Sequence, residues 1–205
     1  MGHYILLGIT FAFAAAVQPG PFQTYLISQA LTKGWRRSLP AALAPLLSDG
    51  PIILLVLLVL VNVPPWLVSV LQLAGGVFLL YLAFGAWRTW REYDVEKILQ
   101  AGSGRQTLLK AALVNLLNPN PYLSWSLVMG PLLLEAWRKT PLDGAGLLLG
   151  FYLTMILCSA GIILLFAASR GLGPRISRLM LGVSAVALAC FGIYELWSGV
   201  QAFRL

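Results

Sequence analysis

Residues 111–134 read AALVNLLNPNPYLSWSLVMGPLLL and contain no Asp, Glu, Lys or Arg. A run of about 20 apolar residues is long enough to cross a bilayer as a helix. Its centre, however, holds Pro119-Asn120-Pro121, and proline removes a backbone donor and pushes on the carbonyl four residues earlier. The charge-free stretch 4–32 holds Pro19-Gly20-Pro21 at the equivalent place, 100 residues upstream. Two broken membrane helices at matched positions therefore define the fold.

The composition of the whole chain agrees with a membrane protein. Of the 205 residues, 59% are hydrophobic and 10% are charged, and the mean hydropathy is +0.83. A soluble domain of this size carries about 25% charged residues, and disordered chains are far less apolar. We expect an all-α membrane protein, with 1–205 as a single transmembrane domain. The six predicted spans are 4–32, 39–61, 67–87, 108–134, 142–168 and 179–203.

The distribution of basic residues predicts the orientation. The first, third and fifth loops carry 11 Lys and Arg residues, against 3 on the other side. Because basic residues are retained in the cytoplasm, we expect both termini to be periplasmic or extracellular. The net charge of +7 is explained by this placement, so nucleic acid is not an expected partner.

The chain also repeats itself. Pro19-Gly20-Pro21-Phe22 matches Pro119-Asn120-Pro121-Tyr122, and Gly75 and Gly85 match Gly182 and Gly192 at an offset of 107. This predicts one three-helix repeat over 1–90, a cytoplasmic linker over 91–107 and a second repeat over 108–205. Because three is odd, the second repeat enters the membrane inverted, a common construction in secondary transporters.

The two breaks predict a binding site at the bilayer midplane. The starts of half-helices favour anions and unwound carbonyls favour cations, which together suit a zwitterionic amino acid. The predicted substrate-binding residues are Gln18, Pro19, Gly20, Pro21, Asp49, Asn118, Pro119, Asn120, Pro121 and Trp125. Two alternatives stay open: the Gln and Asn side chains could only cap carbonyls freed by the prolines, and Trp125 could be a packing residue.

Asp49 is the most informative single residue. It lies ten residues into the second predicted helix, or about 15 Å at 1.5 Å per residue, which is the bilayer midplane. A charged residue at that depth faces a cavity or a partner. Asp49 could hold a substrate ammonium or carry the coupling proton; alternatively, it is a structural acid bonded to a neighbouring helix. Glu195 is expected nearer the outer end of its helix, within reach of the interface.

Several classes of function are disfavoured. Cys158 and Cys190 stand alone, and His3 is the single histidine, so we expect no metal site, cofactor or disulfide framework. The predicted spans contain no nucleophile and base pair, so we do not expect an enzyme.

The motifs resemble those of the LysE/RhtB-type amino-acid exporters. The similarity rests on Gln18-Pro19-Gly20-Pro21, Gly34, Asp49-Gly50, Gly75-Gly76 and Asn118-Pro119-Asn120-Pro121, and it runs over nearly the whole chain. Pro45 and Pro51 depart from the family pattern. The resemblance implies a bacterial inner-membrane exporter of amino acids or related small amines, driven by the proton motive force.

The resulting hypothesis is alternating access by two inverted halves, with Asp49 coupling protons to export. The implied partners are a small-molecule substrate, protons and membrane lipid. A homodimer would be consistent with so small a transporter, although the sequence identifies no interface. The rival hypotheses are an inorganic cation transporter, with Asp49 and freed carbonyls as ligands, and a non-transporting membrane scaffold.

Overall fold

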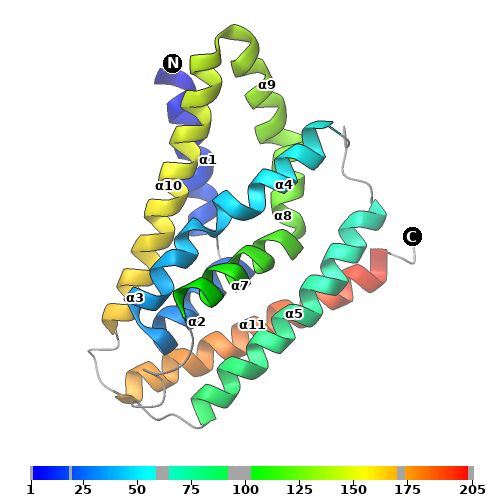
Figure 1. The fold of residues 1–205 in the computed structure, drawn as a ribbon. Helices are drawn as coiled ribbons and strands as arrows, with labels where there is room; N and C mark the ends of the chain where they lie inside the picture. The colour runs from blue at the N-terminus through cyan, green and yellow to red at the C-terminus, as the bar shows by residue number, and fades with distance from the viewer. Residues whose placement is uncertain (1, 19, 59–64, 92–102, 170–173, 203–205) are drawn as a thin grey trace.

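The structure is a computed structural model of the 205-residue chain and describes residues 2–18, 20–58, 65–91, 103–169 and 174–202. These residues are almost entirely helical and include no strand (Figure 1). The connection between the predicted spans 39–61 and 67–87 and the linker predicted over 91–107 fall largely outside the described residues. The all-α expectation is confirmed for the part of the chain that is described.

The elements follow one another in the order shown in Figure 1. They are α1 (Gly2–Val17), α2 (Pro21–Lys33), α3 (Trp35–Ser38), the 3-10 helix η1 (Leu39–Leu43), α4 (Ala44–Leu58), α5 (Pro65–Arg91), α7 (Gly104–Leu117), α8 (Pro119–Ser124), the π-helix η2 (Trp125–Met129), α9 (Gly130–Lys139), α10 (Pro141–Ala168) and α11 (Pro174–Ala202).

Four segments of the described chain are long and apolar enough to cross a membrane. They are Trp35–Val56, Trp66–Arg91, Pro141–Ala168 and Arg178–Gln201. The bent pair α1 and α2, whose axes differ by 66°, makes a fifth if it counts as one span. The protein is therefore a multi-pass membrane protein, but the six predicted spans are met only in part.

The segment predicted as one helix over 108–134 accounts for the difference. It is divided into α7, α8, η2 and α9, none of which is long enough to cross a bilayer alone. The chain leaves the helical conformation at Asn118, with φ −80° and ψ 126°. The following proline disfavours the helical region for the residue before it, which explains the interruption there.

Close glycine contacts hold the long helices in pairs. α5 and α11 run side by side in opposite directions (Figure 1), and a β-carbon on Gly76 would lie 2.8 Å from the carbonyl oxygen of Gly192. A β-carbon on Gly75 would lie 2.8 Å from the carbonyl oxygen of Leu117 on α7. Small residues let membrane helices approach closely. These glycines therefore make close helix contacts.

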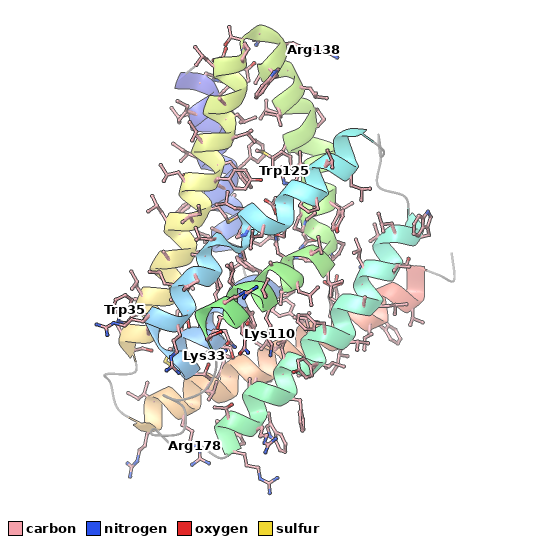
Figure 2. The ribbon with its side chains drawn as sticks, in the orientation of Figure 1. Lys33, Trp35, Lys110, Trp125, Arg138 and Arg178 are labelled. Atoms are coloured by element: carbon pink, nitrogen blue, oxygen red, sulfur yellow. The ribbon has the colours of Figure 1, made fainter. Side chains whose placement is uncertain are left out.

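Two hydrophobic clusters divide the interior between them. One is built mainly from α2, α5, α7 and α11, with residues from η1, α4 and α10. The other is built mainly from α1, α4, η2, α9 and α10, with residues from α5 and α8. Figure 2 shows Lys33, Trp35 and Arg178 toward one end of the bundle, Arg138 at the other and Trp125 between them. The two helix interruptions lie where the clusters meet.

Candidate functional site

The two interruptions begin new helices in different ways. α2 starts at Pro21 after an extended Gly20, with φ −163° and ψ 178°, and no side chain caps it. α8 starts at Pro119, and the Asn118 side chain accepts a hydrogen bond from the backbone nitrogen of Asn120 at 3.0 Å. The first N–H groups of a helix have no partner within it. The N–H groups at the start of α2 are therefore uncapped, whereas the start of α8 is capped by the Asn118 side chain.

Side chains also satisfy backbone carbonyls near the interruptions. Gln23 donates from Nε2 to the carbonyl oxygen of Ala15 at 3.0 Å, and this is one of the carbonyls expected to be freed by the prolines. The Tyr122 hydroxyl donates to the carbonyl oxygen of Leu116 at 2.9 Å. Gln23 therefore caps a carbonyl beside the first interruption, and Asn118 instead caps an N–H group at the start of α8.

A cavity of about 180 Å³ lies between the interruptions. Its walls include the predicted residues Gln18, Gly20, Pro21, Asp49, Asn118, Asn120, Pro121 and Trp125. Pro119 is buried at the start of α8 and is not part of the wall. Pro19 lies outside the described residues. The structure thus brings residues from both halves of the sequence to one cavity.

Asp49 is the acidic group of this cavity. It lies on α4 and is only 3% exposed. Its Oδ1 accepts hydrogen bonds from Asn115 Nδ2 at 2.9 Å and from Ser48 Oγ at 3.4 Å. Its Oδ2 accepts from the Tyr152 hydroxyl at 3.4 Å, and the Trp125 side chain donates a further hydrogen bond to the carboxylate. Hydrogen bonds of this kind stabilise the ionised form of a buried acid.

The remaining wall of the cavity is apolar and aromatic. Phe11, Phe22, Val128, Met129, Phe151 and Met155 line it. The Trp125 and Phe151 rings meet edge to face with centroids 5.8 Å apart. Trp125 is 2% exposed, so it both packs in the interior and walls the cavity. It also begins the π-helical turn η2, a distortion that is frequent at functional sites.

The predicted substrate-binding residues leave out three polar residues around Asp49 and one near it. Asn115 and Ser48 join the carboxylate in one network, because Asn115 Nδ2 also donates to Ser48 Oγ at 2.7 Å. Tyr152 reaches it from α10, and Ser124 lines the cavity. In the sequence, Asn115 and Tyr152 are recognisable as polar residues within charge-free runs. The sequence does not show that both contact Asp49.

The expectation for Glu195 is wrong. Its side chain does not reach the interface: the residue is 8% exposed, and its Oε2 has no hydrogen-bond partner. It faces a small space of about 10 Å³, which Pro21 and Asn118 also line. α11 carries Glu195 inward because its glycines allow close packing on α5.

Among the described residues, no group of three or more His, Cys, Asp or Glu side chains could hold a metal ion. Asp49 also receives neutral N–H and O–H donors, whereas a hard cation requires several free oxygen ligands. The arrangement therefore suits an organic solute that has a positive group and an apolar part.

One comparison with known proteins identifies the family of this chain. The sequence profile of the LysE type translocator family matches residues 13–199, which is most of the chain. No curated protein and no solved structure matches the chain significantly. The matched range includes both helix interruptions, Asp49 and Glu195. On this match, the chain belongs to the LysE type translocator family and is a membrane translocator.

Proposed function

We propose that this protein is a secondary transporter that exports an amino acid or a related small amine across the bacterial inner membrane. The observation that carries the proposal is the buried carboxylate of Asp49 in the wall of a polar cavity between two interrupted helices. A translocator needs a solute site inside the bundle. An acidic side chain, the starts of two helices and apolar side chains all line this cavity.

The two charged groups of an amino acid have different partners in this scheme. The ammonium group binds Asp49, whose neighbours in the network are neutral donors. The carboxylate binds at the uncapped start of α2, where the N–H groups of Phe22 and Gln23 and the helix dipole favour an anion. The start of α8 is less suitable because Asn118 already occupies the N–H of Asn120.

The size of the cavity limits the solute. A volume of about 180 Å³ suits a small amino acid better than a peptide. Phe11, Phe151 and Met155 would contact its side chain. An aliphatic or small polar side chain fits this wall better than a second charge.

Alternating access by two inverted halves would move the solute. The packing of the elements supports this part of the proposal: α1 packs along α10, and α7 packs along α4. The first pairing joins the first and fifth predicted helices, and the second joins the fourth and second predicted helices. Each pairing therefore becomes the other when the first three helices are exchanged with the last three. Each half would then contribute one of the two interrupted helices to the solute pathway.

Proton coupling would supply the driving force. One elementary charge that crosses a potential of about 150 mV gains roughly 3.5 kcal/mol. At about 1.4 kcal/mol per tenfold, this supports a solute gradient of several hundred-fold. With the orientation expected from the basic loops, both termini would be periplasmic, and protons would enter as the solute leaves.

Flux measured in liposomes tests the proposal. The purified protein is reconstituted, and radiolabelled amino acids and amines are screened with and without an imposed pH gradient. We expect saturable flux of at least one small amino acid that increases with the gradient. Absence of flux across a broad panel, with folded protein in the liposomes, would overturn the proposal in favour of a scaffold, and flux of inorganic cations alone would support a cation transporter.

A further inference from the structure

A second buried acid lies directly behind the two helix interruptions. Glu195 on α11 is 8% exposed, and its Oε2 has no hydrogen-bond partner in the structure. The residues that face it come from α2, α5, α7 and the start of α8, and Pro21, Gly75 and Asn118 are among them. None of these lining residues is titratable. Among the described residues, no other charged side chain lines this space with Glu195.

The two buried acids differ in their hydrogen bonding. Asp49 accepts hydrogen bonds from Asn115, Ser48 and Tyr152, which hold its carboxyl group in one position. Glu195 has no such donor at Oε2, and an unpaired charge buried in an apolar site is costly. Pairs of acids whose environments differ in this way commonly divide two roles between them. Asp49 is placed to bind a group in the central cavity, and Oε2 of Glu195 is open to a proton.

Glu195 is also placed to respond to movement at both interruptions. The space in front of it measures about 10 Å³, close to the minimum of about 10–15 Å³ that holds one water molecule. Pro21 and Asn118 line both this space and the central cavity. A displacement of α2 or α8 that opens the cavity would therefore also change the access of water to Glu195.

We infer that Glu195 is the proton-carrying group of this transporter and that Asp49 is the amine-binding group. This inference rests on the proposed function. The sequence suggested amine binding and proton coupling for Asp49 alone, and the inference divides these two roles between two residues. When the site opens to the periplasm, the Glu195 carboxylate takes a proton from water and an O–H bond forms. When the site opens to the cytoplasm, that bond breaks and the proton returns to water.

Transport assays with Glu195→Gln test the division of roles. The variant cannot release a proton, so it should retain exchange of labelled for unlabelled solute but lose accumulation driven by a pH gradient. The pH dependence of wild-type net flux should also disappear. Glu195→Asp should restore part of the gradient-driven accumulation, because it retains a carboxyl group. Glu135→Gln is the matched control, because Glu135 is an exposed acid paired with Lys139.

Chemical labelling tests the protonation of Glu195 without any transported solute. Hydrophobic carbodiimides react with protonated carboxyl groups in apolar surroundings. Peptide mass spectrometry should find an adduct on Glu195 that decreases as the pH is raised, and a much weaker adduct on Asp49.

The outcomes separate the inference from the proposed function. Full gradient-driven accumulation in Glu195→Gln would overturn the inference and leave export intact. An unlabelled Glu195 at every pH would also overturn it. Labelled Glu195 in a protein that transports no solute would instead count against the proposed function while supporting Glu195 as a proton-binding group.

Discussion

Replacing Asp49 with Asn removes the charge of the central cavity and replaces one of the two acceptor oxygens with an NH2 group. The side chains have nearly the same size, and the amide oxygen can accept the hydrogen bonds that Oδ1 accepts from Asn115 at 2.9 Å and Ser48 at 3.4 Å. The amide nitrogen would face the Tyr152 hydroxyl, which can accept a hydrogen bond as well as donate one. We therefore expect Asp49→Asn to insert and fold normally.

The loss should appear in binding of the substrate ammonium. A hydrogen bond to a charged group contributes about 1.5–3 kcal/mol, and each 1.4 kcal/mol is about tenfold in affinity. Asp49→Asn should therefore weaken substrate binding by about 10- to 150-fold. Because Asp49 is only 3% exposed, solvent screening will not reduce this effect greatly.

Two measurements check this prediction. Flux in liposomes gives KM, and the rise in Tm with added substrate gives Kd, because a ligand stabilises the state that it binds. Glu135→Gln, on the surface, should leave both values unchanged. If folded Asp49→Asn binds its substrate within about twofold of the wild type, a shift of only about 0.4 kcal/mol, Asp49 does not hold the amine and the assignment is refuted.

Three further substitutions test the architecture around the site, with Tm of the purified protein as the measurement. Gln23→Leu leaves the Ala15 carbonyl without its donor and should cost about 1–3 kcal/mol of stability; an unchanged Tm would show that water replaces it. Asn118→Ala removes the cap of α8 and should cost about 1 kcal/mol, whereas Asn118→Asp, which can still accept from the helix, should not. Gly75→Ala places a methyl group 2.8 Å from the Leu117 carbonyl oxygen and should cost about 1–3 kcal/mol. Gly50→Ala, with no atom within 4 Å of the new carbon, is the matched control, and equal Tm losses would contradict the packing explanation.

Much of the architecture could be predicted because its causes are local. Charge-free runs predicted the long helices α5, α10 and α11 to within a few residues at the ends that are described. The membrane environment is set by composition. The expectation that Asp49 faces a cavity or a partner followed from its position along a helix, and the structure shows it facing both.

The rest depends on contacts between distant parts of the chain. Nothing local shows that Asn115 and Tyr152 share Asp49 as a partner, since they lie 66 and 103 residues away from it. Glu195 was misplaced because position along a helix does not give the direction of a side chain. The subdivision of 104–139 was missed because the proline pair predicts one break, whereas the chain also has the π-helical turn at Trp125.

The uncapped start of α2 has a consequence for how substrate range can diversify. Its donors are main-chain N–H groups, which almost every sequence supplies, so substitutions around it can alter the approach of a carboxylate but cannot readily remove the donors themselves. In the proposed binding mode, the part of the substrate beside Phe11, Phe151 and Met155 would meet side chains instead. Variation among translocators of this kind can then accumulate on that wall while the anchor for the carboxylate persists, and a change of substrate by engineering should begin there.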